Sequence, residues 1–587
     1  MTTISPTPFP EGGVRKLSDK ETMQRAKAAA CTVPQDNRPT CSGQVFVGVF
    51  FDGTGNNMKL DYESPSPDER KHTNIVKLFQ AYRFAPLRGY YPFYIPGVGT
   101  PFPEIGDSNN YIGTNRGSVA GERGEARIIW AFTRLLNAPH RFVFNNAPLI
   151  PDAVAKTITN NVAGTLEPAA MRRVVLNTWQ DKLKAALAGN KPTVEQINLS
   201  VFGFSRGAAE ARAFVNWLFE LCKEDGGGWT FAGIPIRVQF LGIFDTVASV
   251  GLANLYDNGV LKGHQSWADN NLEIHPAVEQ CVHYVAGHEI RACFPSDSVR
   301  VNSSYPGNAM EVMYPGAHSD VGGGYAPSDL GVSPTQDSFL AIIPGVNMYH
   351  EARKAGVPLI EWGGLNEAVQ RALIPSTTVI TDFNNYLGAA KIGIGSIEEL
   401  GRRNMSLYFS YRFKYLTSYD YYHTAPYEHS SRTDQGYLYT TQRSFFMQLA
   451  KLCELITKND PQFAATWPFQ QKYGSSLDRA SRSWDEMSAA PSTLDKAMNM
   501  AWKYSMPGML VAAVKAPFAA AQEKSSLDHA FEVAQSIRVE SVTPEIQTFF
   551  DRYIHDSEAG FIAMGMNEYA YNGIGIVKFR TVYKGNG

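Results

Sequence analysis

The stretch INLSVFGFSRG, residues 197–207, decides the fold that we expect for this chain. Residues 197–204 form a largely apolar run, which is typical of a strand buried on both faces. Apolar residues then recur at helical spacing over residues 206–222, and a third apolar run covers residues 236–244. Strand, helix and strand within about 50 residues make a βαβ unit. The sequence therefore predicts an α/β fold with a mostly parallel sheet covered by helices.

The pentapeptide GFSRG, residues 203–207, is a G-x-S-x-G motif at the point where the strand gives way to the helix. A serine in this place sits on a sharp turn and projects its hydroxyl from the sheet edge, and the flanking glycines leave room for the turn. The first helical N–H, from Arg206, would point at a developing oxyanion. The motif predicts Ser205 as a nucleophile. The alternative is a structural turn in which the serine caps the helix.

A nucleophilic serine needs a base, and the base needs an acid that orients it. Asp245 follows the strand predicted at 236–244, so it should lie at the same sheet edge as Ser205. His318 lies in PGAHSDVGGGY, residues 315–325, where glycines on both sides shape a loop able to present an imidazole. The order Ser205, Asp245, His318 is the chain order of α/β-hydrolases. These three residues are the predicted catalytic set.

Other residues compete for two of these roles. His555 is a rival base, because the histidine of many hydrolases comes late in the chain. Asp320 is an alternate acid, or a group that supports the histidine loop. Asp245 itself could be no more than a loop-capping aspartate.

A second glycine-rich loop follows the apolar run at residues 45–51 and reads DGTGNN, residues 52–57. It lacks the G-K-[ST] ending of a phosphate-binding loop. As the turn after a buried strand, it could supply a second oxyanion donor, the backbone N–H of Gly53 or Thr54. Asp52 would then order the loop through hydrogen bonds. The alternative is a plain Gly/Asn turn.

Composition narrows the class of protein. The chain has 587 residues, of which 44% are hydrophobic and 19% charged, so it can bury a large core. Its 54 basic and 56 acidic residues create no global field for nucleic acid. We find no signal peptide and no apolar run of about 18 residues, and therefore expect synthesis in the cytoplasm. The six cysteines form no C-x-x-C pair, and we expect neither a metal nor a cofactor.

The chain divides into three predicted parts. Residues 1–43 read as an N-terminal arm, and residues 44–345 as the catalytic domain, with an insertion of helices and loops at about 140–195. Residues 346–587 read as a mostly helical C-terminal region, either a cap or a membrane-anchoring module. Within it, the alternating aromatic residues at 409–415 predict a strand.

Aromatic and apolar residues of the C-terminal region have two possible uses. Tyrosine favours membrane interfaces, and residues 506–521 could form an apolar helix face. Both features could equally belong to the core of this region. The tyrosines concerned are Tyr408, Tyr411, Tyr415, Tyr419, Tyr421, Tyr422 and Tyr427.

Four sequence blocks together resemble a known family. They are FFDGTGNN (50–57), GFSRGAAEAR (203–212), FDTVASVG (244–251) and PGAHSDVGGGY (315–325), in this order along residues 44–330. They are similar to the signature blocks of the α/β-hydrolase family that includes the first class of type VI secretion lipase effectors. The block at 244–251 is the loosest of the four.

The resemblance implies an antibacterial phospholipase of type A1 or A2 that uses Ser205, Asp245 and His318 as a triad. It implies secretion by a type VI system into the periplasm of a target cell, where the enzyme degrades membrane phospholipid. It also implies a VgrG-like spike protein for delivery and a cognate immunity protein. A soluble carboxylesterase or thioesterase, and a non-catalytic adaptor of the secretion spike, are the alternatives.

Overall fold

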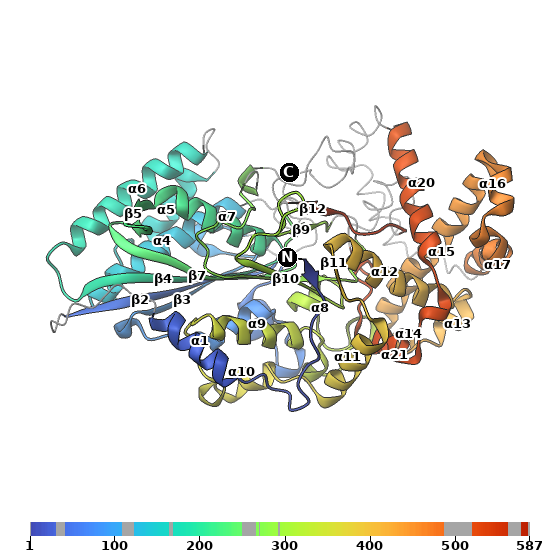
Figure 1. The fold of residues 1–587 in the computed structure, drawn as a ribbon, viewed down its shortest axis with the longest axis horizontal. Coiled ribbons are helices and arrows are strands. Elements are labelled where there is room, and N and C mark those ends of the chain that lie inside the picture. The colour runs from blue at the N-terminus through green and yellow to red at the C-terminus, as the bar shows by residue number, and fades with distance from the viewer. Residues whose placement is uncertain are drawn as a thin grey trace.

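A mostly parallel β-sheet with helices on both faces lies at the centre of the molecule (Figure 1). The computed structural model describes residues 2–30, 41–108, 123–163, 168–248, 266–268, 271–291, 294–486, 519–561 and 577–584. The main path of the sheet runs in the order β11 (Ile394–Gly395), β1 (Thr3–Ile4), β10 (Ala309–Tyr314), β8 (Cys281–Ala286), β7 (Ile234–Phe244), β4 (Thr193–Phe204), β2 (Ser42–Phe51) and β3 (Tyr90–Ile95). This is the predicted α/β-hydrolase-like fold.

Parallel pairing brings the carboxyl ends of the central strands to one edge of the sheet. Phe204 at the end of β4 pairs with Phe244 at the end of β7, and Phe244 pairs with Tyr284 of β8. On the far side of β8, Ala286 pairs with Tyr314, the last residue of β10. The loops that follow these strands are therefore neighbours. The antiparallel exceptions in the described chain are β11 on β1 and the hairpin of β5 (Lys223–Asp225) and β6 (Gly228–Phe231) beside β7.

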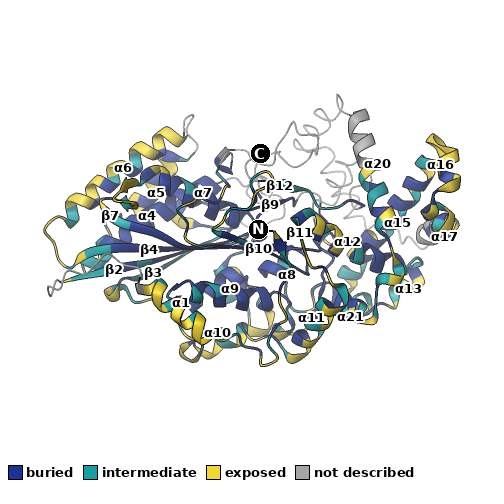
Figure 2. Cartoon of the chain, viewed as in Figure 1, coloured by how far each residue is buried: buried dark blue, intermediate teal, exposed yellow. Residues whose placement is uncertain are grey.

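The two faces of the sheet bury different side chains, because successive residues of a strand point to opposite faces. One face carries aromatic residues such as Phe202 and Phe240, and the other carries aliphatic residues such as Val201 and Leu241. Helices α4 (Gly124–Val143), α5 (Asp152–Val162), α6 (Pro168–Leu187) and α7 (Arg206–Leu221) cover the aliphatic face, whereas α2 (Asn74–Ala81) and α9 (Ile342–Lys354) cover the aromatic face. Figure 2 shows the buried strands between these layers.

The segment predicted as an N-terminal arm is built into this architecture. Strand β1 pairs with β10 in parallel, and Thr3 Oγ1 donates a 2.8 Å hydrogen bond to the buried carboxylate of Glu311. Phe9 is buried in the core of the aromatic face, and α1 (Asp19–Ala30) follows it. The first residues of the chain therefore complete the sheet and its core.

The C-terminal region is largely helical and shares the aromatic core with the sheet. The strand predicted at residues 409–415 is wrong, because α12 (Ile397–Lys414) occupies that stretch as a helix. The other helices of eight or more residues are α11 (Thr377–Ala390), α15 (Arg432–Asn459), α17 (Pro468–Glu486), α20 (Ala519–Ser536) and α21 (Pro544–Tyr553). The shorter ones are α10 (Glu367–Ala372), α13 (Ser418–Tyr422), α14 (Ala425–His429) and α16 (Pro461–Thr466), whereas the short helix α8 (His318–Gly322) precedes this region.

Several tyrosines singled out in the sequence lie in this shared core. Tyr408 and Tyr411 of α12 are buried, whereas Tyr419 is 69% exposed. Most of the apolar stretch at 506–521 lies outside the described residues. Among the helices that the structure describes, none has both the length and the apolar character needed to cross a bilayer.

Candidate active site

Ser205 occupies a strained turn between β4 and α7. Its φ is 60° and its ψ is −127°, a conformation that residues with a side chain rarely adopt. The turn is possible because both flanking glycines lie against main chain: a Cβ on Gly203 would lie 2.4 Å from the Gly207 carbonyl oxygen, and one on Gly207 would lie 2.3 Å from that of Asp52. The Ser205 hydroxyl makes no capping hydrogen bond to α7. This argues against the structural alternative, in which the serine caps the helix.

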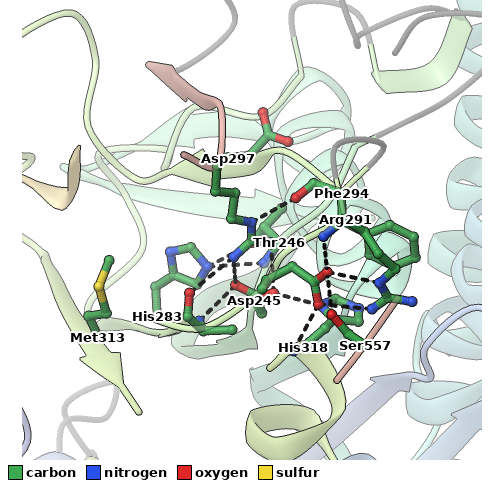
Figure 3. A network of polar contacts seen from close by, with 12 residues as sticks. Asp245, Thr246, His283, Arg291, Phe294, Asp297, Met313, His318 and Ser557 are labelled. Atoms are coloured by element: carbon green, nitrogen blue, oxygen red, sulfur yellow. Dashed lines mark hydrogen bonds and ion pairs between the residues drawn. The ribbon is translucent and has the colours of Figure 1, made fainter. Parts of the chain in front are cut away.

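Asp245 and His318 form a buried pair at the same sheet edge. Asp245 directly follows β7, and His318 begins α8 after the short loop that follows β10. The His318 Nδ1 atom lies 2.5 Å from Asp245 Oδ2, and both residues are buried (Figure 3). With Nδ1–H donating to the carboxylate, the ring leaves Nε2 as the atom able to accept a proton.

The His318 loop is packed directly against the Ser205 turn. The rings of Phe204 and His318 lie 4.6 Å apart between centroids. A Cβ on Gly322 would lie 2.0 Å from the Phe204 ring, so only glycine lets α8 come this close. Ser205 and His318 make no hydrogen bond to each other in the described structure. Hydrogen bonds between a nucleophile and its base are often long before substrate binds.

The electrostatic setting favours a neutral histidine beside an ionised aspartate. Burial lowers the pKa of His318 below its ordinary value, although the hydrogen bond to Asp245 opposes this shift. For Asp245, burial alone would raise the pKa, but the positive charge of Arg580 and the contact with His318 outweigh it and hold the pKa well below its usual range. A neutral imidazole is the form that a general base requires at neutral pH.

The rival base and the alternate acid are found paired with each other. His555 Nδ1 lies 2.6 Å from Asp320 Oδ1, and the His555 ring is stacked on Tyr325 with centroids 3.6 Å apart. Asp320 Oδ2 also accepts hydrogen bonds from the backbone N–H groups of Ala317 and His555. Asp320 therefore ties α8, which carries His318, to the segment at residue 555.

The loop after β2 lies beside the Ser205 turn, and Asp52 orders it. Asp52 accepts hydrogen bonds from Thr73 Oγ1 (2.6 Å), Tyr94 Oη (2.5 Å) and the Gly53 N–H (2.8 Å). The Gly53 N–H is thus already engaged. The backbone N–H of Thr54, in contrast, makes no hydrogen bond within the described structure. Of the two predicted oxyanion donors in this loop, the geometry favours Thr54.

Several residues of the site could not be predicted from the sequence. Arg580 makes two hydrogen bonds to Asp245, each 2.8 Å long, across 335 positions of the chain. Glu289 accepts hydrogen bonds from the His318 N–H (3.1 Å) and from Ser557 Oγ (2.9 Å). Arg291 pairs with Glu289 and holds the pKa of that carboxyl at about 2, against the opposing effect of burial. No motif surrounds these residues, so nothing local marked them.

One solved structure with a related architecture supports the fold. The crystal structure of an uncharacterized protein from Pseudomonas aeruginosa is 24% identical and has a TM-score of 0.71, over 99% of this chain and 85% of that chain. The structure of the Tle1 effector bound to the VgrG spike from the type 6 secretion system is 21% identical, over 56% of this chain and 58% of that chain. Its TM-score of 0.26 is too low to show a shared fold. No curated protein matches the chain significantly.

A family defined by sequence covers the part of the chain that carries this site. The family described as "T6SS, Phospholipase effector Tle1-like, catalytic domain" matches residues 47–222 and 223–351, just over half of the chain. The matched region contains Ser205, Asp245 and His318, whereas Arg580 and His555 lie outside it. The chain therefore belongs to the Tle1-like family of type VI secretion phospholipase effectors.

Proposed function

We propose that the protein is a serine phospholipase of type A, which hydrolyses an acyl ester of a membrane glycerophospholipid. One observation carries this proposal: a buried His318–Asp245 pair, 2.5 Å apart, lies at the sheet edge where Ser205 sits on a strained turn. Family membership supplies the class of substrate.

In the proposed mechanism, Ser205 Oγ attacks the ester carbonyl carbon while His318 Nε2 takes the hydroxyl proton. Asp245 stabilises the imidazolium that forms. Backbone N–H groups of Arg206 and Thr54 stabilise the oxyanion. The lysophospholipid leaves with the proton from His318, and water, activated by the same histidine, then releases the fatty acid from Ser205.

We further propose the setting in which this reaction takes place. Because the family is one of type VI effectors, we infer delivery on a VgrG-like spike into the periplasm of a target cell, and an immunity protein that protects the producer. We infer that residues 44–345 are the catalytic domain and that residues 346–587 act as a cap rather than a membrane anchor. Contacts from Ser557 and Arg580 to the residues around His318 favour the cap.

The test is product analysis on mixed-chain phosphatidylethanolamine and phosphatidylglycerol vesicles. Wild type should release fatty acid and lysophospholipid, and the identity of the released chain gives the position that is cut. Ser205→Ala and His318→Ala should each lower turnover by about 10⁴-fold or more. Circular dichroism and the melting temperature should show that both variants remain folded.

His555→Ala is the matched control, because this buried histidine has an aspartate partner but lies outside the proposed triad. It should keep much more activity than His318→Ala. Full hydrolysis by folded Ser205→Ala would end the serine mechanism. Activity confined to short soluble esters would indicate a soluble esterase, and killing that is unchanged in Ser205→Ala would indicate a spike adaptor.

A further inference from the structure

The guanidinium of Arg580 binds both oxygens of the Asp245 carboxylate. Nη1 donates to Oδ1 and Nη2 donates to Oδ2, each over 2.8 Å. The side chains are 8% and 0% exposed, so this two-bond contact is shielded from water. Bidentate arginine–carboxylate pairs are among the strongest and most directional contacts in proteins.

These bonds fix the orientation of the carboxylate. Oδ1 accepts hydrogen bonds from Arg580 and from the backbone N–H of Ala286 (2.9 Å). Oδ2 accepts hydrogen bonds from Arg580 and from His318. With each oxygen engaged twice, the carboxylate cannot rotate without breaking several hydrogen bonds. Oδ2 is therefore held where His318 needs it.

Arg580 also contacts Phe294, a residue that packs against His318. Arg580 Nε donates a 2.7 Å hydrogen bond to the Phe294 carbonyl oxygen. The Phe294 ring packs edge-on against His318, with centroids 5.1 Å apart. Arg580 thus contacts both Asp245, which is hydrogen-bonded to His318, and Phe294, whose ring packs against His318.

We propose that Arg580 is a positioning residue of the triad, which orients Asp245 and restrains protonation of His318. This inference rests on the proposed serine mechanism. Arg580 lies beyond the segment that defines the family, so the catalytic centre extends into the C-terminal region.

The charge of Arg580 gives the inference a distinct signature. The charged groups that act on the pair come from two elements: Glu289 and Arg291 follow β8, and Arg580 precedes β12 (Val582–Lys584). Asp320 of α8 is paired instead with His555. Removal of Arg580 leaves the negative charge of Asp245 less compensated, so the imidazolium of His318 becomes more stable. Since a general base must be neutral, the acidic limb of the pH profile should move to higher pH.

A cavity next to Arg580 allows this role to be separated from a purely structural one. The cavity has a volume of about 230 Å³, and Ala286, Phe579, Arg580 and Val582 are among the residues that line it. In Arg580→Ala, the space of the lost guanidinium would therefore open into an existing cavity. Added guanidinium or methylguanidinium ion should enter it and bind Asp245.

The experiment measures kcat, KM and the pH dependence of kcat/KM on phospholipid vesicles for full-length variants. Arg580→Ala should lower kcat by about 10- to 100-fold, by analogy with the loss of a group that orients a metal-binding residue. Its KM should stay near that of wild type, its acidic limb should move up, and low concentrations of guanidinium should restore turnover. Arg580→Lys keeps the charge but cannot bridge both oxygens, so its loss should be smaller.

Arg353→Met is the control, because Arg353 is comparably buried, with an 11% exposed side chain, and pairs with the exposed Glu361. It should keep the turnover and pH profile of wild type. If Ser205→Ala is inactive but Arg580→Ala keeps the turnover and pH profile of the Arg353→Met control, the inference about Arg580 is overturned and the serine mechanism stands. An active Ser205→Ala would overturn the serine mechanism and this inference with it. If Arg580→Ala does not fold, Arg580→Lys decides, and an unchanged kcat and pH profile in that variant overturns the inference.

Discussion

The strained backbone of Ser205 is the most informative feature of a single residue in this protein. Such a conformation costs about 1–3 kcal/mol and persists only where the surrounding structure enforces it. Here the enforcement comes from the Ser205 N–H, which donates to the Phe244 carbonyl oxygen, and from the Val247 N–H, which donates to that of Ser205. The turn that carries the proposed nucleophile is thus hydrogen-bonded to Phe244 and Val247, which lie before and after Asp245 in the chain.

Asp52 predicts a measurable dependence of stability on pH. Burial raises its pKa to about 7, although Thr73, Tyr94 and the Gly53 N–H oppose the shift. Between these two pKa values, Asp52 is therefore protonated in the folded chain, whereas the same carboxyl in the unfolded chain, with a pKa of about 3.9, is ionised. The stability that this proton contributes is present below about pH 4 and is lost as the pH rises towards 7.

Asp52→Asn removes this titration. Between about pH 4 and pH 7 the free energy of unfolding of Asp52→Asn should fall less steeply with rising pH than that of wild type. The two slopes should differ by up to about 1.4 kcal/mol per pH unit. Urea unfolding at several pH values measures the difference. An identical slope in both proteins would show that Asp52 does not titrate in this range.

How well single residues could be predicted depended on local signals. The strand that precedes Asp245 and the glycines around His318 pointed to both residues, and the structure brings these two together. Arg580 has neither signal. Its partner is 335 positions away, and only the folded chain brings the two side chains into contact.

The contact of α7 with the end of β2 determines how close the Ser205 turn lies to the loop at Asp52. Gly207 makes this contact possible. A Cβ there would lie 2.3 Å and 2.6 Å from the carbonyl oxygens of Asp52 and Phe51. Because these are main-chain atoms at the end of β2 and directly after it, they cannot move aside as a side chain would.

Gly207→Ala should therefore destabilise the protein by about 1–3 kcal/mol, as overpacking typically does, and should lower turnover by displacing the loop after β2. Gly388→Ala is the matched control, because Gly388 is an exposed glycine within α11 that has no atom near its Cβ position. That change should leave turnover unaltered and raise stability by about 0.5–1 kcal/mol. Urea unfolding and initial rates check both expectations. Equal effects of the two changes would contradict the close contact of α7 with β2.

The prediction of a strand at residues 409–415 failed for a reason specific to this region. Alternating aromatic residues indicate a strand when one face of the segment is polar. Helix α12 is instead buried on several sides, so Phe409, Tyr411 and Phe413 are all buried although Tyr411 lies on the opposite side of the helix from the other two. Residues 408–413 are all buried, so this part of the helix has no exposed polar stripe that would distinguish its pattern from that of a strand.

The whole molecule has a larger common core than the sequence indicated. We expected an N-terminal arm because residues 1–43 show only weak hydrophobic periodicity. A segment that packs on the core through a few specific contacts shows the same weak periodicity. Phe9 shows how this segment docks. Its backbone N–H donates to Asn384 Oδ1 (2.7 Å), its carbonyl oxygen accepts from Asn384 Nδ2 (2.9 Å), and its ring is buried.

Phe9→Ala should therefore lower the free energy of unfolding by about 3–5 kcal/mol, the usual cost of removing a buried aromatic ring. Met23→Ala, in the same segment but 65% exposed, should change it by no more than about 0.5 kcal/mol. Thermal or urea unfolding of the full chain provides the measurement. A negligible effect of Phe9→Ala would mean that the segment is not part of the core.

The distance along the chain between Asp245 and Arg580 has a consequence for biosynthesis. Ribosomes add roughly 5–20 residues per second, so Arg580 is translated roughly 20–70 seconds after Asp245. During that interval a nascent chain already contains the serine, the aspartate and the histidine, but not the guanidinium that steadies them. A ribosome-bound chain therefore lacks the residue proposed to orient Asp245 until translation is almost complete.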